Sequence, residues 1–140
     1  MLSALSGAGA EYLVVGAHAL AVHGYPRATG DLDIWVRPTK ENATRVWQAI
    51  EKYGAPRRNM TVGDFHTSNT VFQIGVAPGR IDLMTSIDGI EFDVAWQNRR
   101  PHVVDDHPFF VIGRNDLLQN KRASGRPKDL ADVAWLESSE

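Results

Sequence analysis

The chain has 140 residues and a hydrophobic content of 43%, which is enough for one domain with a single core. Its 15 Lys and Arg residues nearly balance 17 Asp and Glu residues, so the formal net charge is −2. This balance excludes the broad basic field of a typical nucleic-acid-binding protein, and any contact with a nucleotide or RNA must be local. The chain has no cysteine, which excludes disulfide bonds, thiolate zinc sites and cysteine nucleophiles and agrees with a cytoplasmic location.

No apolar run approaches the roughly 18 residues needed to span a bilayer, and the first residues lack the basic start of a secretory signal. We therefore expect a soluble protein that is not exported. The sequence shows no repeat and no Ser-, Gln- or Pro-rich linker. A single domain over residues 1–140 is the simplest prediction.

The predicted elements begin with a short helix that carries Leu2 and Leu5 on one face and ends in small residues. The apolar run over 12–15, closed by Gly16, predicts a buried strand. The Ala-rich segment over 17–23 then predicts a helix, so this region should form a strand, a tight turn and a helix.

The segment over 31–36 alternates in polarity, which predicts a strand. One face of this strand carries Leu32, Ile34 and Val36, and the other carries Asp31, Asp33 and Trp35. The next helix is predicted from the N-cap Thr39 to about Tyr53, with Gly54 at its end.

The second half of the chain gives weaker but readable patterns. Residues 55–69 are polar and irregular. The remaining elements are predicted as strands over 71–76 and 80–84, a short helix over 92–98 with Trp96 inward, an apolar run over 109–112, and helices over 116–124 and from Pro127 onward.

The pair Asp31 and Asp33 is the first candidate for chemistry. Composition alone predicts about two acid-x-acid pairs, and two occur, so the spacing by itself has little meaning. The context is more informative, because this pair lies on a strand of otherwise buried-type residues, where an uncompensated carboxylate would be costly. Carboxylates in such a place need a cation, although an accidental set of exposed strand-end carboxylates remains the alternative.

A third carboxylate, Asp82, lies on the predicted strand 80–84 between two apolar residues. If this strand neighbours the strand of Asp31 and Asp33, the three side chains would form a cradle for Mg²⁺. Two-metal sites place their ions about 3.5 to 4 Å apart, and two carboxylates on one face of a strand can both bind ions at that spacing. Hard oxygen ligands, without cysteine or a well-spaced histidine pair, favour Mg²⁺ over Zn²⁺.

The turn at Gly16 and Ala17 is the second candidate. It joins a strand to a helix, and the backbone N–H groups at such a turn can bind phosphate. Gly16 would allow close approach of a phosphate group, or alternatively only close packing of the helix on the strand. A metal cradle beside a phosphate-binding turn would suit phosphoryl-group transfer.

These residues resemble a known family, the DNA polymerase β superfamily of nucleotidyltransferases, in its minimal single-domain form. The matching features are Val15-Gly16-Ala17, the pair Asp31-Leu32-Asp33 and the later Asp82. The chain is most similar to nucleotidyltransferases of the toxin–antitoxin and abortive-infection type (AbiEii-like). That similarity rests on the segments 23–29 and 120–129, and the likeness covers about residues 12–136.

The resemblance implies an α/β (α+β) nucleotidyltransferase fold with a mixed β-sheet and helices packed mainly on one face. It also implies Mg²⁺-dependent transfer of a nucleoside monophosphate from an NTP to a hydroxyl of a protein, an RNA such as tRNA, or a small molecule. Asp31, Asp33 and Asp82 would be the catalytic and metal-binding residues for two Mg²⁺ ions. The expected nucleotide-binding residues are Gly16, Ala17, Arg27, Thr29 and Lys121.

Several of these assignments have plain alternatives. The family usually has Gly or Ser where this chain has Ala17, so phosphate binding would depend on the backbone. Arg27 and Thr29 could be ordinary loop residues. Lys121 belongs to a basic group with Arg122, Arg126 and Lys128 that could bind triphosphate or RNA, or form a solvated helix face. Among the five histidines, His18 beside the turn is the one to test.

Two other classes of function stay open. The chain could be a non-catalytic component of a toxin–antitoxin pair that binds a protein partner through the same fold, or a regulator that binds a nucleotide without turnover. A homodimer is possible, because dimerisation commonly covers an exposed sheet, but no residue identifies the surface.

Overall fold

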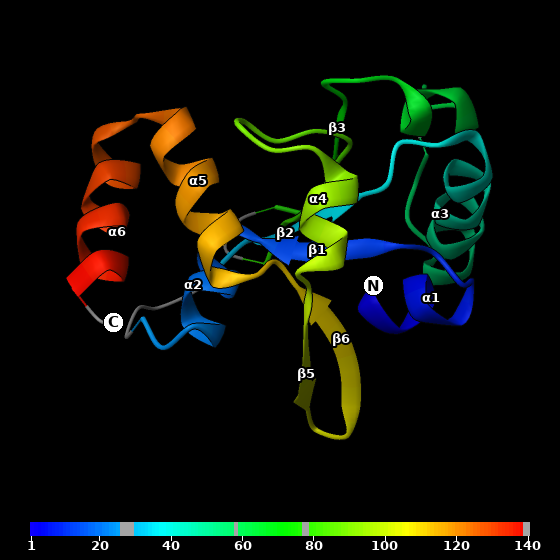
Figure 1. Ribbon diagram of the computed structural model, residues 1–140. Coiled ribbons are helices and arrows are strands. Elements are labelled where there is room, and N and C mark those ends of the chain that lie inside the picture. Colours follow the sequence, from blue (N-terminus) through cyan, green and yellow to red (C-terminus); the bar gives the residue numbers. More distant parts are fainter. Residues whose placement is uncertain (26–29, 58, 77–78, 139–140) are drawn as a thin grey trace.

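The computed structural model describes residues 1–25, 30–57, 59–76 and 79–138. Within these ranges the chain forms one six-stranded sheet, six α-helices and one 3₁₀ helix (Figure 1). In chain order these are α1 (Leu2–Gly7), β1 (Tyr12–Val15), α2 (Gly16–Val22), β2 (Leu32–Val36), α3 (Lys40–Tyr53), η1 (Val62–His66), β3 (Val71–Ile74), β4 (Ile81–Met84), α4 (Phe92–Gln97), β5 (Arg100–Val104), β6 (His107–Val111), α5 (Arg114–Ser124) and α6 (Pro127–Ser138).

The sheet is mixed, as predicted, with strand order β3-β4-β2-β1-β6-β5. β1 runs antiparallel to β2 and parallel to β6, and β4 runs parallel to β2 and antiparallel to β3. β5 and β6 form an antiparallel hairpin that projects from one side of the molecule (Figure 1). The central pair β1 and β2 therefore joins the two halves of the sheet.

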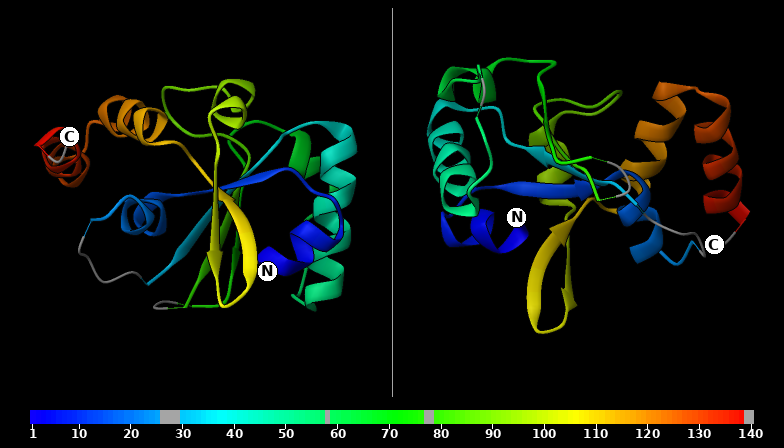
Figure 2. Two further views of the ribbon diagram at one scale, coloured as in Figure 1. Left: turned by 60° about the horizontal axis from the view of Figure 1, so that its bottom comes forward. Right: turned by 180° about the vertical axis from the view of Figure 1, so that it is seen from behind.

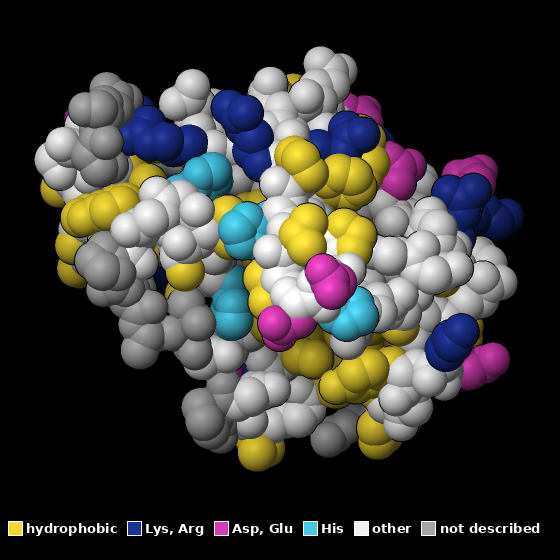
Figure 3. Space-filling model, turned by 90° about the horizontal axis from the view of Figure 1, so that it is seen from below, with side chains coloured by type: hydrophobic (Ala, Val, Ile, Leu, Met, Phe, Trp, Pro, Cys, Tyr) yellow, Lys and Arg dark blue, Asp and Glu magenta, His cyan; other side chains and the backbone are white. Residues whose placement is uncertain are grey.

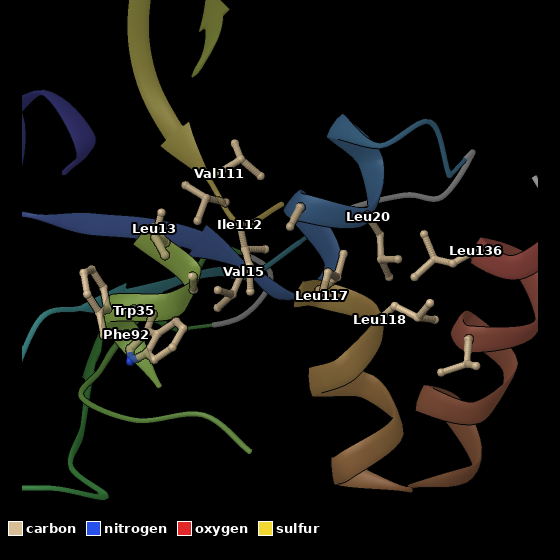
Figure 4. Close-up of a cluster of buried hydrophobic side chains, with 14 residues drawn as sticks. Leu13, Val15, Leu20, Trp35, Phe92, Val111, Ile112, Leu117, Leu118 and Leu136 are labelled. Atoms are coloured by element: carbon tan, nitrogen blue, oxygen red, sulfur yellow. The ribbon is translucent and has the colours of Figure 1, made fainter. Parts of the chain in front are cut away.

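Both faces of the sheet are covered by buried side chains. Leu13 lies opposite Trp35 and Tyr12 opposite Val36, and these two pairs occupy opposite faces because side chains alternate along a strand. Leu13 and Trp35 belong to a cluster with residues of α2, α4, α5 and α6 (Figure 4). Tyr12 and Val36 belong to a second cluster with residues of α1, α3 and η1. Four of the six described α-helices thus share one cluster, in agreement with the prediction of helices mainly on one face.

Helix α3 illustrates how local sequence fixes an element. The Thr39 side chain accepts a hydrogen bond from the Asn42 backbone N–H, and Gly54 ends the helix with φ of 89°. Asn42 itself is buried and binds the neighbouring strands: its Oδ1 accepts from the Glu11 N–H, and its Nδ2 donates to the carbonyls of Glu11 and Arg37. The predicted N-cap and C-cap are both confirmed.

Two elements were not predicted from the sequence. Strand β5 lies at the sheet edge and is largely exposed, so it lacks the buried alternation that marks a strand. The tight turn to β6 places Asp105 and Asp106 at positive φ, 51° and 64°. Helix η1 lies in the segment that looked irregular, where a capping box between Thr61 and Asp64 starts it.

The first and last helices lie at opposite ends of the molecule (Figure 2). The face at the hairpin end shows exposed hydrophobic side chains next to acidic and histidine side chains (Figure 3). Val103 and Val104 of β5 are among the exposed hydrophobic residues. No helix in the described ranges has the length and apolar character required to cross a membrane.

Candidate active site

The sheet brings Asp33 and Asp82 together. β2 and β4 are parallel neighbours, and their register places Asp33 directly beside Asp82. Since adjacent strands lie about 4.8 Å apart and laterally paired residues share a face, both carboxylates project from the same side of the sheet. Asp31 comes one residue before β2 begins and lies on that side by strand alternation. The adjacency of the two strands, which the sequence could only assume, is present.

Gly16 lies against the Asp33 carboxylate. Val15, the last residue of β1, pairs with Asp33, and the chain then bends at Gly16 with φ of 68°. A Cβ added to Gly16 would lie only 2.3 Å from Asp33 Oδ2, so no larger residue fits without moving the carboxylate. The expected turn from β1 into α2 therefore meets the acidic side chains directly, and Ala17 follows as the second residue of α2.

The surroundings of Asp33 disfavour the ionised form of its carboxyl group. Burial raises the pKa of its carboxyl, and the nearby carboxylates of Asp82 and Asp31 raise that pKa further, whereas Arg80 and His18 partly lower it. Within the described part of the chain, no hydrogen bond or ion pair engages the Asp33 carboxylate. His18, singled out for its place beside the turn, thus lies close enough to Asp33 to act on it electrostatically.

Arg80 is the residue that the sequence reasoning missed. Its guanidinium forms ion pairs with two of the three carboxylates: Nε lies 3.0 Å from Asp82 Oδ1, and Nη2 lies 3.2 Å from Asp31 Oδ2. Its backbone N–H also donates to Asp31 Oδ1 at 3.3 Å. The signal was available, because Arg80 precedes Asp82 by two residues and a strand places such residues on one face.

The carboxylates suit a hard divalent cation, with one condition. Three carboxylates supply the oxygen ligands that Mg²⁺ prefers, and burial, together with the charges of Asp82 and Asp31, raises the pKa of Asp33. However, no three acidic or histidine side chains of the described residues already surround one point as metal ligands would. The Arg80 guanidinium already pairs with oxygens of Asp31 and Asp82, so a metal ion at these oxygens would have to compete with it.

Lys121 is placed differently from the expectation of a phosphate ligand. It is buried between α5 and α6, where its Nζ lies 3.2 Å from Asp129 Oδ1 and 3.2 Å from Asp132 Oδ2. Burial alone would raise the pKa of Asp129, but hydrogen bonds from Arg126 and Lys121 hold it below its ordinary value. The Lys121 ammonium is therefore engaged in holding two helices together.

Arg126 differs from Lys121 in its exposure. Its Nε donates to Asp129 Oδ2 at 2.7 Å, yet 76% of its side chain is exposed. Hydrogen bonding and charge attraction from Asp129 raise the pKa of Arg126, and Asp33 is among the further carboxylates that do so. In the basic group of the C-terminal helices, Arg126 is thus a member that lies within electrostatic reach of Asp33.

Two expected nucleotide-binding residues, Arg27 and Thr29, lie outside the described residues. Cavities of about 470 and 720 Å³ open elsewhere in the described structure, and the lining residues of neither include Asp31, Asp33 or Asp82. The three carboxylates therefore lie outside these cavities, at a site bordered by Gly16 and Arg80.

The fold and these side chains define the structural class of the protein. It is a single mixed-sheet α/β domain with three clustered carboxylates beside a strand-to-helix turn. No protein-family model and no curated protein matches the sequence. A solved structure does match, that of a protein from Thermotoga maritima provisionally described as a nucleotidyltransferase. The TM-score is 0.62 at 15% identity, and the match covers 99% of this chain and 89% of that one. The similarity confirms the predicted nucleotidyltransferase fold.

Proposed function

We propose that the protein is a Mg²⁺-dependent nucleotidyltransferase that transfers a nucleoside monophosphate from an NTP to a hydroxyl group. The observation that carries this proposal is the contact between the Gly16 turn and Asp33, with Asp82 beside it in register. A phosphate-binding turn and a cation-binding carboxylate group serve phosphoryl transfer only when they are adjacent. The similarity in fold to the Thermotoga protein supports the same class of reaction.

Each residue has a role in this proposal. Asp31, Asp33 and Asp82 would hold two Mg²⁺ ions, which neutralise phosphate charge and lower the pKa of the attacking hydroxyl. Asp82 lies beside Asp33 and would accept the proton of that hydroxyl. The hydroxyl oxygen then bonds to the α-phosphorus as the bond to the β-phosphate oxygen breaks, and pyrophosphate leaves.

The remaining phosphates are assigned to the turn. The first backbone N–H groups of a helix have no partner within the helix, so those of Gly16 and Ala17 are available to phosphate oxygens. Arg27 and Thr29 are proposed to reach the same anion. Because its ammonium pairs with two carboxylates, we leave Lys121 out of the proposed phosphate ligands.

The acceptor is proposed to be a hydroxyl of a protein, a tRNA end or a small molecule. The test is incubation with each of the four α-³²P-labelled NTPs, Mg²⁺ and separate total RNA and total protein fractions. We expect wild-type protein to label one fraction and Asp33→Asn to lose labelling by about 100-fold or more, the scale of removing an electrostatic group from an active site. Asp105→Asn, in the exposed hairpin turn, is the matched control and should label normally.

Two results would contradict the proposal. One is wild-type protein that labels neither fraction with any of the four NTPs and also labels no small molecule of a cell extract. The other is equal labelling by wild-type protein and a folded Asp33→Asn variant, which would place the activity elsewhere.

A second candidate function is a non-catalytic, partner-binding component of a toxin–antitoxin pair. The observation in its favour is the edge strand β5, which exposes Val103 and Val104 at 59% and 49%. An exposed apolar edge strand is a common site of strand pairing with another chain, including a second copy of the same chain. A complex that persists in Asp33→Asn and is lost in Val103→Lys would favour this function.

A further inference from the structure

Arg80 is held at the carboxylate group by its backbone. The Leu32 N–H donates to the Arg80 carbonyl at 2.9 Å, and the Arg80 N–H donates to Asp31 Oδ1 at 3.3 Å. These two hydrogen bonds fix the Arg80 main chain next to the start of β2. The side chain is less constrained, since a third of it is exposed to solvent. The guanidinium can therefore move while its residue stays in place.

The guanidinium uses the oxygens that a metal ion would need. Both oxygens of Asp82 receive hydrogen bonds from it, at 3.0 and 3.3 Å, and Asp31 Oδ2 lies 3.2 Å from Nη2. Among the three carboxylates, only that of Asp33 has no contact with Arg80 within ion-pair distance in the described structure. A cation that binds Asp31 and Asp82 through these oxygens would lie next to the guanidinium, so the two positive charges compete for the same carboxylates.

The charges at the three carboxylates also favour competition between Arg80 and a metal ion. Three carboxylates so close to one another repel, and Asp82 is almost fully buried. The single positive charge of Arg80 offsets part of this repulsion when no metal ion is present. Two positive charges on a metal ion would offset more, and would also repel a guanidinium that stayed between the same carboxylates.

We propose that Arg80 is a built-in counter-ion of the carboxylate group, which a divalent metal ion must displace from Asp31 and Asp82. This inference rests on the proposed function, because it takes these residues to be metal ligands. In the metal-free protein the guanidinium stabilises the acidic group. On metal binding the side chain turns toward solvent, still tethered beside the site by its backbone. Arg80 thereby lowers the affinity of the free protein for metal ions.

The test is direct Mn²⁺ binding without nucleotide, followed by electron paramagnetic resonance of free Mn²⁺. We expect the Mn²⁺ dissociation constant of Arg80→Gln to be roughly tenfold lower than that of wild-type protein, since two partly exposed ion pairs no longer compete. Arg80→Lys, which keeps the charge but not the two-pronged geometry, should fall between them. Arg57→Gln is the matched control, because Arg57 pairs with Glu51 on α3 and not with these carboxylates.

A second readout is thermal unfolding with and without Mg²⁺. Arg80→Gln should unfold at a lower temperature than wild-type protein without metal, and should gain more stability than wild-type protein when Mg²⁺ is added. This check also reports whether each variant is folded.

The outcomes separate the inference from the proposed function. Equal Mn²⁺ affinity in wild-type protein and folded Arg80→Gln, or weaker binding by the variant, would overturn the role of Arg80 and leave the metal site intact. No Mn²⁺ binding by either protein would overturn both. Tighter binding by Arg80→Gln that is lost in Arg80→Gln combined with Asp33→Asn would support both.

Discussion

Substitution of Gly16 by Ala probes the contact between the turn and the carboxylate. Gly16 has φ of 68°, and an L-residue with a side chain costs about 1–2 kcal/mol in this conformation. The new Cβ would also lie 2.3 Å from Asp33 Oδ2, so the Asp33 side chain must leave its position. An off-rotamer side chain adds about 0.5–1.5 kcal/mol. We expect Gly16→Ala to lower the free energy of unfolding by about 2–3 kcal/mol, together with weaker Mn²⁺ binding.

Urea unfolding of two variants separates the backbone and contact contributions. Gly9→Ala is the matched control, since Gly9 has φ of 72° and no atom within 4 Å of an added Cβ. It should lose only the backbone contribution of about 1–2 kcal/mol and retain Mn²⁺ binding. In an Asp33→Ala background, where the clashing carboxylate is gone, Gly16→Ala should cost about 1 kcal/mol less than in wild-type protein.

If Gly16→Ala and Gly9→Ala have the same effect on stability and on Mn²⁺ affinity, Gly16 does not press on Asp33. The same conclusion would follow if the cost of Gly16→Ala were unchanged by removal of the Asp33 carboxylate.

Three further substitutions test separate parts of the account. Asp33→Asn should raise the melting temperature at pH 7, because burial and the neighbouring carboxylates raise the pKa of Asp33 and the folded protein binds that proton more tightly than the unfolded chain. Wild-type stability is therefore lost as pH rises from the ordinary carboxyl pKa through the raised pKa of Asp33. The gain in melting temperature from Asp33→Asn should vanish at pH values below both of these pKa values. A gain of the same size at every pH would argue against this cause. Lys121→Met leaves Asp129 and Asp132 buried without their shared cation and should cost about 3–5 kcal/mol in urea unfolding, whereas a loss under about 1 kcal/mol would show that the ion pairs contribute little. Asn42→Ala removes three hydrogen bonds to backbone groups and should cost about 2–4 kcal/mol by the same assay, and a neutral effect would mean that water replaces them freely.

The elements that the sequence predicted well are those whose signal is local. The apolar run over 12–15 forms β1, and Thr39 and Gly54 are the N-cap and C-cap of α3, as expected. These patterns work because capping and alternation act within a few residues. Strand β5 was not predicted because an exposed edge strand needs only backbone pairing with β6, and its side chains show no alternation of buried and exposed residues.

The site was predicted in its residue types but not in its contacts. The alternation of 31–36 gave the face of Asp33, yet the pairing with Asp82 depends on which strands become neighbours. That choice is made by packing of the whole sheet, across about 50 residues of chain. The ion pairs of Arg80 were missed for a related reason: a strand pattern shows that Arg80 and Asp82 share a face, but not that Asp31 joins them.

Lys121 shows the limit of a basic group as a signal. Lys121 and Arg126 look alike in the sequence, but one is buried between two carboxylates and the other is mostly exposed. The difference arises because α5 and α6 pack together and place Asp129 and Asp132 against Lys121. Only the contact between the two helices separates a structural cation from one available to a ligand.

The most direct test of the central claim is a crystal structure of the protein with Mn²⁺ and a non-hydrolysable NTP, with the manganese located by anomalous scattering. Under the proposed function, we expect manganese bound by the carboxylates of Asp31, Asp33 and Asp82, the terminal phosphates at the Gly16 turn, and the Arg80 guanidinium no longer between Asp31 and Asp82. Manganese bound elsewhere, or a nucleotide far from Gly16 while Arg80 keeps both ion pairs, would contradict it.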